Sequence, residues 1–431
     1  MQLVAYGAQD IYLTGNPQIT FFKVVYRRHT NFAVESIEQT FNGQADFDKR
    51  VTATISRNGD LIQQMYLEVV LPVCTALGAD AGSNVWTYGV GNALVKQADI
   101  EIGGQLIDRQ YGNWMNIWTE LTVPAGKRDG YDDMVGNKLT ANITNNNQQG
   151  GLSYLTTQQL YIPLQFWFNR NPGLALPLIA LQYHEVKLNL EIRKLTDLTN
   201  SVNVVATTIG NLGCKLYVDY VYLDTDERRR FAQVSHEYLI EQVQFTGAET
   251  ISSGDSSKNI TLNFNHPVKE LVWVHTTTLH TTGGTDATSN KWFNYSGTNS
   301  GTKSGSSDSF TTGLLQLNGH DRFSVRNADY FRKVQNYEHH TRVPRVGADL
   351  SGTNADDKVA AFRQYIYSYS FALSPEEHQP SGTCNFSRID NAVMQLKYNK
   401  DDNAGLSLFI YAVNYNVLRI MSGMGGLAYS N

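Results

Sequence analysis

The sequence contains two His-Glu pairs, at residues 184–185 and 236–237, which are residue types used by zinc-dependent proteases. Such an enzyme needs a second histidine four residues after the first, so that one helix face directs both imidazoles at the metal. Those positions hold Leu188 and Ile240. The residues around His184 also follow a strand pattern. Neither pair therefore indicates a metal site.

Two other groups of polar side chains could do chemistry but have a simpler interpretation. Asp224 and Asp226 have a spacing that would place two carboxylates on one strand face, as a glycosidase requires. The arginines at 228–230 favour ion pairs in a linker instead. His339 and His340 are adjacent, and in a strand their side chains would diverge. We therefore expect a surface or packed histidine pair and no catalytic carboxylates.

The glycines and cysteines do not form a recognisable active site either. The glycine-rich stretches at 89–91 and 423–426 do not join a strand to a helix, as a nucleotide-binding loop must. The three cysteines, Cys74, Cys214 and Cys384, lie far apart and form no CxxC pair. We therefore predict no catalytic residues, no metal and no cofactor, and we expect three reduced, largely buried thiols.

Four Asn-x-Ser/Thr sequons occur, at Asn142, Asn259, Asn294 and Asn385. Asn142 and Asn294 lie in two long insertions, where a glycan could project, whereas Asn259 and Asn385 border predicted strands. The N-terminal sequence MQLVAYGAQD lacks the basic and apolar regions of a signal peptide. Glycosylation at these positions and unmodified loop asparagines both stay open as interpretations.

The charge distribution argues against direct binding of nucleic acid. The net charge is -5, and the densest basic groups are Lys23 with Arg27 and Arg28, and the arginines at 228–230. A chain that coats nucleic acid needs larger clusters of lysine and arginine to displace counterions. No apolar run approaches the ~20 residues of a membrane-spanning helix. With the unpaired cysteines, these features predict folding in a reducing cytoplasm.

The apolar residues indicate an all-β protein with much protein–protein contact. Charged residues make up only 17% of the chain, while aromatic residues reach 11% and include 24 tyrosines. Most apolar segments are short and alternate, as at 51–55, 260–264 and 408–412. The segments 161–168 and 216–223 are apolar on both faces, which predicts strands covered on both sides. Short helices are expected only at 114–121 and 226–232.

The most informative feature is a repeat with an offset of about 200 residues. Short sequence patterns of the first half recur in the same order in the second half. The matched segments are 37–39 with 240–242, 67–69 with 271–273, 100–104 with 315–319, 108–109 with 321–322, 161–162 with 365–366, 188–190 with 394–396, and the strands starting at 216 and 408. A period of this length excludes solenoids and propellers, whose units are ~20–50 residues long.

The repeat predicts two tandem eight-stranded jelly-roll β-sandwiches, a double jelly roll. The first sandwich is expected at 35–223 and the second at 237–431, and the charged residues 224–236 form a solvated linker between them. Residues 1–34 precede the first sandwich. Long insertions at 124–157 and 276–313 distinguish the halves, and the aromatic residues Trp292, Phe293 and Tyr295 predict that the second insertion packs on the body of the protein.

Several longer segments resemble the major capsid proteins of nucleocytoplasmic large DNA viruses, most strongly those of algal viruses (phycodnaviruses). They include LTGNPQITFFK at 13–23, NPGLALPLIALQYHEVK at 171–187, HEYLIEQ at 236–242 and PSGTCNFSRIDN at 380–391. The segment NYNVLRIMSGMGGLAY at 414–429 completes the match. The resemblance extends over the whole chain except the two insertions.

The resemblance implies a structural protein of the virion that is assembled in the host cytoplasm. It implies a homotrimer whose six sandwiches mimic a hexagon, and icosahedral tiling by these capsomers. It also places residues 1–34 at the inner face of the shell, where Lys23, Arg27 and Arg28 would meet minor capsid proteins or an internal membrane. In that family outer loops often carry glycans.

Two alternatives stay open on the sequence alone. A tandem-sandwich lectin or glycan-processing enzyme would need an acidic pair, or an aromatic platform in a cleft, where the halves meet. A minor or vertex protein of the same capsid would share the fold but occur in fewer copies per virion.

Overall fold

The computed structural model describes residues 7–73, 86–137, 157–199, 210–278, 290–295, 308–344, 364–398 and 405–429. Within these ranges the chain forms four antiparallel sheets, which make two sandwiches. Cys74, Asn142 and most of both predicted insertions lie outside the described residues.

The first sandwich consists of two five-stranded sheets. One sheet has the order β1-β10-β4-β7, with the short β8 paired to β4, and the other has the order β2-β3-β9-β5-β6. The strands are β1 (Phe32–Gln39), β2 (Phe41–Asn42), β3 (Arg50–Thr54), β4 (Leu61–Leu71), β5 (Val95–Ile102), β6 (Gln105–Tyr111), β7 (Gln158–Pro163), β8 (Leu176–Pro177), β9 (Val186–Ile192) and β10 (Gly213–Leu223).

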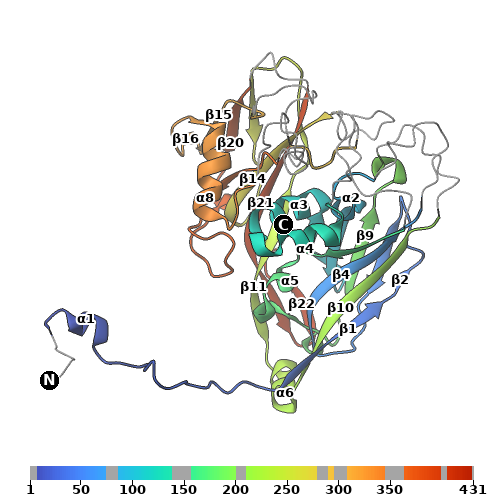
Figure 1. The fold of residues 1–431 in the computed structure, drawn as a ribbon, viewed down its shortest axis with the longest axis vertical. Coiled ribbons are helices and arrows are strands. Elements are labelled where there is room, and N and C mark those ends of the chain that lie inside the picture. Colours follow the sequence, from blue (N-terminus) through green and yellow to red (C-terminus); the bar gives the residue numbers. More distant parts are fainter. Residues whose placement is uncertain are drawn as a thin grey trace.

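The second sandwich has a larger sheet of order β11-β21-β14-β18, extended by three short strands, and a sheet of order β13-β20-β15-β16 to which β17 is added. Its strands are β11 (His236–Phe245), β12 (Glu249–Ile251), β13 (Ser257–Thr261), β14 (Pro267–Thr277), β15 (Thr312–Leu317), β16 (His320–Asp321), β17 (Arg326–Asn327), β18 (Tyr367–Ser370), β19 (Cys384–Asn385), β20 (Ala392–Lys397), β21 (Leu406–Met421) and β22 (Met424–Leu427). Figure 1 shows this sandwich beside the first.

The two sandwiches have the same topology. When the eight principal strands of each half are numbered along the chain, leaving out the short β2, β8, β12, β17, β19 and β22, one sheet of each sandwich has the order 1-8-3-6 and the other the order 2-7-4-5. The matched sequence segments occupy equivalent strands: 37–39 lie in β1 and 240–242 in β11, while 188–190 lie in β9 and 394–396 in β20. The double jelly roll predicted from the repeat is confirmed.

Helices cover the ends and sides of the sheets. Both predicted helical segments are present, as α3 (Gly112–Thr122) and α6 (Thr225–Gln233). The helix α6 buries none of its side chains, and it connects β10 to β11 across the base of the molecule. The other short helices are α1 (Asp10–Thr14), α2 (Val90–Leu94), α4 (Ala125–Val135), α5 (Trp167–Arg170), α8 (Gln335–His339), the π-helical turn η5 (Tyr330–Val334), and the 3₁₀ turns η1 (Pro172–Leu174), η2 (Leu178–Ala180), η3 (Leu195–Asp197) and η7 (Phe386–Arg388).

Three local predictions were wrong. The start of the first insertion is the helix α4 and not a loop. The segment 161–168 is not a single strand, because β7 ends at Pro163 and α5 begins at Trp167. The strands β7 and β10 also alternate between buried and half-buried residues, with Tyr161 and Tyr217 on the half-buried side. A tyrosine has an apolar ring and a polar tip, so an apolar-looking strand can still have a face in contact with solvent.

A single cluster of buried apolar side chains extends through both sandwiches. Its largest fully buried members include Trp86, Trp114 and Trp167 in the first half and Trp273 in the second. Because the cluster continues from one sandwich into the other, the two halves are packed together and are not independent domains joined by a linker.

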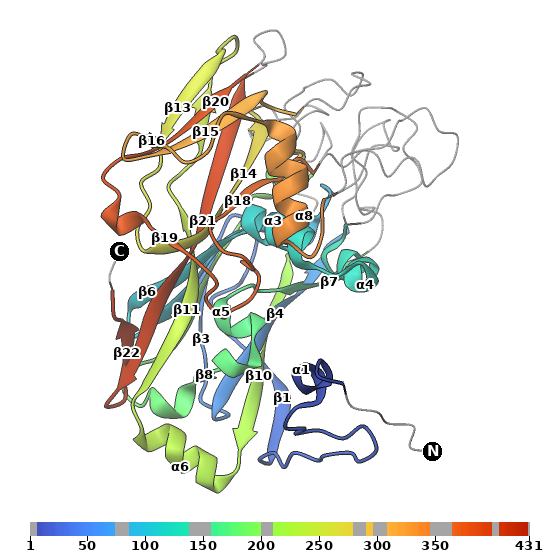
Figure 2. The ribbon, with the colours of Figure 1, turned by 90° about the vertical axis from the view of Figure 1, so that its left-hand side faces the viewer.

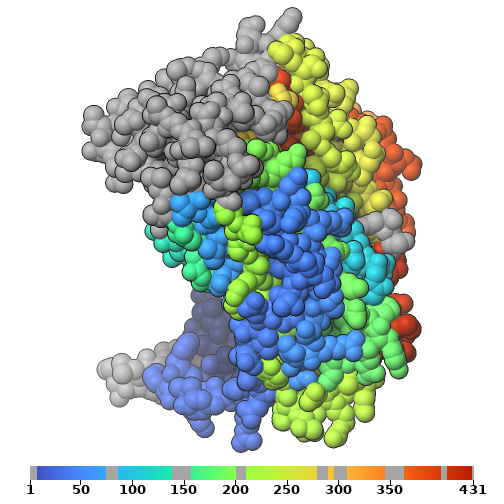
Figure 3. All heavy atoms as spheres, turned by 90° about the vertical axis from the view of Figure 1, so that its right-hand side faces the viewer, coloured from blue at the N-terminus to red at the C-terminus, as the bar shows by residue number. Residues whose placement is uncertain are grey.

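The N-terminal arm, defined here as residues 7–31, extends away from the first sandwich (Figures 1 and 2). In the surface view of Figure 3, the arm stands clear of the body below the first sandwich. Its apolar side chains are exposed; Phe21 and Phe22, for example, are each 98% accessible to solvent. The isolated chain thus offers this segment no packing partner within the described residues.

Candidate assembly interface

The junction between the sandwiches joins two edge strands, β6 of the first sandwich and β11 of the second. The side chain of Gln242 on β11 donates a hydrogen bond to the backbone carbonyl of Ile107 on β6. In return, Oδ1 of Asp108 accepts a hydrogen bond from the backbone N–H of Val243 at 3.2 Å. Figure 2 shows β6 alongside β11. The polar groups of both edges are therefore used in the contact.

Aromatic side chains fill the space beside these strands. The ring of Trp114, on α3, lies 5.3 Å from that of Tyr411 on β21. Tyr111 contacts Phe245 edge to face, with ring centres 5.1 Å apart. Aromatic pairs at such distances add ~0.5–1.5 kcal/mol each beyond the area that they bury. The strand–helix corner after β6 is thus packed on the outer face of the second sandwich.

The second insertion also packs against the first sandwich, as predicted from its aromatic residues. The indole N–H of Trp292 donates to the carbonyl of Asp197 at 2.7 Å, and the guanidinium of Arg193 lies 3.7 Å from the centre of its ring. The hydroxyl of Tyr295 donates to the side chain of Asn116 on α3 at 3.1 Å. These contacts fix the described part of the insertion, residues 290–295, to the junction.

A buried charge cluster crosses the same junction. Glu241 on β11 pairs with Arg170 of the first sandwich at 3.2 Å and with Lys269 on β14 at 2.8 Å. Burial alone would raise the pKa of Glu241, but His378, Lys269 and Arg170 together lower it to about 2. Arg170 also lies over the ring of Trp118, 4.4 Å from its centre. Removing one partner of such a pair would leave an uncompensated buried charge, which commonly costs ~3–5 kcal/mol.

A second cluster fixes the end of α8. The two ring nitrogens of His340 lie 3.0 Å from Glu270 and 3.1 Å from Glu376. Burial alone would lower the pKa of His340, but the two carboxylates raise it to about 9, so the ring is charged at neutral pH. Two residues further on, the backbone N–H of Arg342 donates to the carbonyl of Leu121 on α3 at 3.0 Å. Of the predicted histidine pair, His340 therefore belongs to a structural clamp. The two histidines lie at the end of the helix α8, whereas a strand was expected.

The other side chains considered for chemistry also have structural roles. His184 lies 3.0 Å from the carbonyl of Gly425, and His236 lies 2.9 Å from that of Phe231. Asp224 caps α6 by accepting a hydrogen bond from the N–H of Thr225. Within the described ranges, no group of three or more histidine, cysteine or acidic side chains is arranged to hold a metal ion. No described helix is long and apolar enough to cross a membrane.

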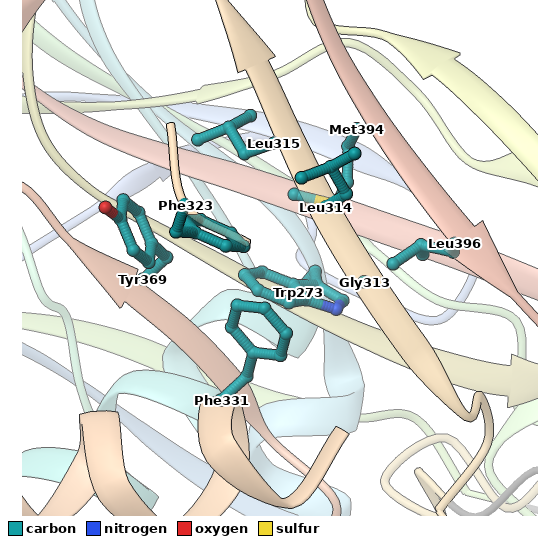
Figure 4. A pocket seen from close by; sticks show the side chains of 9 residues that line it. All are labelled: Trp273, Gly313, Leu314, Leu315, Phe323, Phe331, Tyr369, Met394 and Leu396. Carbon is teal, nitrogen blue, oxygen red and sulfur yellow. The ribbon is translucent and has the colours of Figure 1, made fainter. Parts of the chain in front are cut away.

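An apolar pocket lies within the second sandwich (Figure 4). It lies between β14, β15 and η5 and is lined by Trp273, Gly313, Leu314, Leu315, Phe323, Phe331, Tyr369, Met394 and Leu396. No acidic side chain is among these residues, so the pocket lacks the carboxylates that glycoside hydrolysis requires.

The two described cysteines are free, and Cys74 lies outside the described residues. Cys214 and Cys384 are half-buried. Burial raises the pKa of the Cys214 thiol to about 12 and also raises that of Cys384. Both groups therefore stay protonated at neutral pH, and a protonated thiol is a poor nucleophile and metal ligand.

The predicted glycan acceptors differ in accessibility. Asn259 is exposed on the edge strand β13, whereas Asn294 is half-buried in the insertion packed at the junction. Asn385 is exposed, but its side-chain oxygen accepts a hydrogen bond from the N–H of Ser387 in its own sequon. The predicted basic contact residues Lys23, Arg27 and Arg28 all lie exposed on the N-terminal arm.

Sequence reasoning did not identify the junction residues as an interface. Asp108 and Glu241 were recognised only as members of the repeated segments, and Arg170 was not singled out. Nothing in the local sequence shows that these three side chains converge, because they lie on elements 60 or more residues apart. The sequence repeat was the only feature that could have pointed to these residues. It predicts that equivalent strands of the two sandwiches have equivalent neighbours.

The buried Asp108 generates a prediction about pH. Burial raises its pKa to about 6, whereas an aspartate in an unfolded chain has a pKa of ~4. The folded protein therefore binds this proton more tightly, so the stabilisation from Asp108 is complete below pH ~4 and is lost as the pH rises through 6. Asp108→Asn should therefore gain stability relative to the unmodified chain, by ~2 kcal/mol, as the pH rises from 4.5 to 8.

Urea unfolding followed by circular dichroism across this pH range measures the effect. The exposed Asp226→Asn serves as the matched control and should show no such trend. A difference between Asp108→Asn and the unmodified chain that stays constant from pH 4.5 to pH 8 would contradict the assignment.

Known proteins resemble the chain over its whole length. The family described as "Major capsid protein N-terminus" matches residues 20–224, and the family "Large eukaryotic DNA virus major capsid protein" matches 227–350 and 360–426. The major capsid protein of Pyramimonas orientalis virus is 53% identical over 438 residues, covering 100% of this chain and 99% of the relative. That of Paramecium bursaria Chlorella virus 1 is 43% identical over 472 residues, with the same coverage.

The solved structures agree with these sequence matches. A chain of the PBCV-1 virus capsid superposes with a TM-score of 0.77 at 37% identity, covering 96% of this chain and 100% of that chain. The Faustovirus major capsid protein gives a TM-score of 0.72 at 13% identity over 96% of this chain and 94% of that chain, which shows a shared fold. This chain therefore belongs to the family of large eukaryotic DNA virus major capsid proteins, and it is a structural, non-enzymatic component of the icosahedral virus shell.

Proposed function

We propose that the chain builds the shell as a homotrimer in which six sandwiches form a pseudo-hexagonal capsomer. The observation that carries this proposal is the repeated strand order, 1-8-3-6 and 2-7-4-5, in two sandwiches that share one core. Three such chains supply six nearly equivalent sides. A capsomer with six similar sides can meet six neighbours, which is the requirement for tiling a shell.

The internal junction supports a ring as the form of assembly. It joins different surfaces of the two sandwiches, the β6 side of the first and the β11 side of the second. A contact between different surfaces is head-to-tail, and repetition of a head-to-tail contact closes a ring when its rotation completes a circle. Capsomers formed in this way would assemble with minor capsid proteins in the host cytoplasm.

The purified chain should therefore be a trimer at micromolar concentration. We expect an obligate interface that buries more than ~2,000 Å², which would hold the trimer together at this dilution. Multi-angle light scattering should give three times the chain mass of 48.2 kDa. A monodisperse monomer would contradict the proposal.

We also propose that the N-terminal arm faces the inside of the shell and contacts an anionic membrane surface or the inner proteins. Residues 11–34 contain no acidic side chain but include Lys23, Arg27 and Arg28. Exposed aromatic residues adjoin these cations: Phe22 directly precedes Lys23, and Tyr26 directly precedes Arg27. A basic segment beside an anionic bilayer gains ~1 kcal/mol for each cation.

Replacing Lys23, Arg27 and Arg28 with glutamine should weaken binding of the trimer to phosphatidylserine-containing vesicles by ~100-fold, the equivalent of ~3 kcal/mol. Vesicle flotation measures this, and packaging in virions provides the biological readout. The matched control removes three exposed cations from the body, as Lys49→Gln, Arg229→Gln and Arg230→Gln. Unchanged vesicle binding together with unchanged inner-layer attachment would count against the proposal.

We propose Asn259 as the most accessible glycan acceptor of the three described sequons, because it is exposed on an edge strand and its side chain forms no hydrogen bond within the described residues. Chain purified from virions should then exceed the sequence mass, and Asn259→Gln should remove that excess. Intact-mass spectrometry decides the point, and a native mass equal to the sequence mass would exclude glycans at all four sequons.

A further inference from the structure

We propose that the apolar pocket of the second sandwich is a binding site for a small, uncharged molecule. This molecule is mostly apolar and carries one hydrogen-bond acceptor, as a ketone or an ester does. The inference does not depend on the proposed trimer. It rests on the lining of the pocket, on one buried donor without a partner, and on the residues that the first sandwich has at the matched positions.

The pocket lies between the two sheets of the second sandwich (Figure 4). Trp273 on β14 and Tyr369 on β18 belong to one sheet, whereas Leu315 on β15 and Met394 on β20 belong to the other. A bound molecule would therefore contact both sheets. It would also give the surrounding side chains van der Waals contacts that a gap in the core denies them.

The lining determines the polarity of the ligand. No charged side chain lines the pocket, and the polar groups of its side chains are the indole N–H of Trp273 and the hydroxyl of Tyr369. A charged molecule would lose its hydration there without gaining a countercharge, which is strongly unfavourable. An apolar site of this kind excludes water and takes up apolar molecules of fitting size. The ligand is therefore uncharged and mostly apolar.

The indole N–H of Trp273 supplies the polar contact. Trp273 is only 1% exposed, and its Nε1 has no hydrogen-bond partner within the described residues. Figure 4 shows this nitrogen on the side of Gly313 and Leu396, which also line the pocket. Nearly all buried polar groups of a folded protein have a partner. An acceptor atom on a bound molecule would provide one for this donor.

Neighbouring rings hold the indole of Trp273 in this orientation. The ring of Phe331, on η5, contacts it edge to face with the ring centres 5.2 Å apart. The ring of Tyr367 is stacked on it at 6.0 Å. Because packed core side chains occupy fixed rotamers, the donor does not turn towards another partner. A donor fixed in advance favours a ligand whose acceptor lies at this point.

The first sandwich shows that the fold does not require these residues. In the sequence repeat, Val69 stands at the position of Trp273, and Ala98 stands at that of Gly313. Ala98 pairs with β9, and Gly313 pairs with its counterpart β20, so the second match also holds in the structure. The same strand order thus forms with neither the indole nor the glycine. These two residues are a particular feature of the second sandwich.

The half-buried lining residues, Leu314, Phe323 and Tyr369, mark the mouth of the pocket. The space is about 220 Å³ when the part open to solvent is counted, and its enclosed part holds about one water-sized group. Phe323 lies in the loop between β16 and β17, and its neighbours Arg322 and Ser324 are exposed. A ligand of about six non-hydrogen atoms therefore enters when the ring of Phe323 rotates outwards.

Two probes of nearly equal shape test the site. Cyclopentanone carries a carbonyl oxygen where methylenecyclopentane has a CH₂ group. The purified chain, in its native assembly, should bind the ketone about 10-fold more tightly than the hydrocarbon, because a net hydrogen bond contributes about this factor. Saturation-transfer NMR titrations measure both affinities. This comparison is made on the unmodified chain and needs no variant.

Trp273→Phe removes the donor and keeps an aromatic ring. It should reduce the preference for the ketone to less than about 2-fold. The matched control is Trp114→Phe at the junction, where another buried indole N–H has no partner within the described residues. That variant should keep the preference of the unmodified chain.

Gly313→Ala reduces the space in the pocket. The added Cβ would lie 3.1 Å from Cε2 of Phe331 and 3.3 Å from Cδ2 of Leu396, both of which line the pocket. One extra carbon atom in an apolar pocket should weaken the binding of both probes at least ~10-fold. The matched control is Gly126→Ala on α4, where the added Cβ would meet nothing within 4 Å, and it should leave both affinities unchanged.

The site is supported if the preference for the ketone is lost in Trp273→Phe alone and if Gly313→Ala alone weakens both probes. Equal binding of the two probes to the unmodified chain overturns the inference. A preference that survives Trp273→Phe, or binding that Gly313→Ala leaves unchanged, also overturns it. So does a chain that binds neither probe, which includes a pocket covered by a neighbouring protein. Light scattering on the same samples checks that each variant keeps the assembly of the unmodified chain.

Discussion

The contact between the edge strands β6 and β11 determines how the two sandwiches of the chain are placed against each other. An edge strand exposes unpaired N–H and C=O groups, and a protein must cover or blunt such an edge to avoid uncontrolled association. Here Gln242 and Asp108 satisfy backbone groups across the junction, and Trp114 and Tyr111 fill the space beside them. The two jelly rolls consequently behave as one rigid block with a defined angle between them.

That rigidity explains how a protein without an active site can have a demanding function. A shell protein must present the same shape to many neighbours. A variable angle between its halves would make the contacts between neighbouring chains differ from one copy to the next. The ion pairs of Glu241 with Arg170 and Lys269 oppose such flexibility, because sliding of the sandwiches would separate buried charges. The His340 clamp similarly fixes α8 to β14 and the loop at Glu376.

The fold could be predicted from the sequence because the pattern of one sandwich occurs in both halves of the chain. Two sandwiches were indicated by short alternating strands, by turn residues and by matched segments in the same order. In the structure, the two sandwiches have the same strand order. The junction could not be predicted in the same way. Glu38 and Glu241 occur in the same local pattern, yet Glu241 is buried in an ion-pair cluster while Glu38 is exposed beside Lys215. The difference arises from neighbours distant in the chain, which local patterns do not encode. The prediction that the strand at 216–223 is buried on both faces was wrong for a related reason, since its tyrosines form a face that the isolated chain leaves uncovered.

A cryo-electron microscopy map of the assembled particle, at a resolution that shows side chains, would show how the two sandwiches of each chain are placed in the shell. We expect each capsomer to contain three copies of the chain, with β6 beside β11 in every copy and six sandwiches arranged in a ring. A capsomer with another number of chains, or copies in which β6 and β11 are separated, would contradict this expectation.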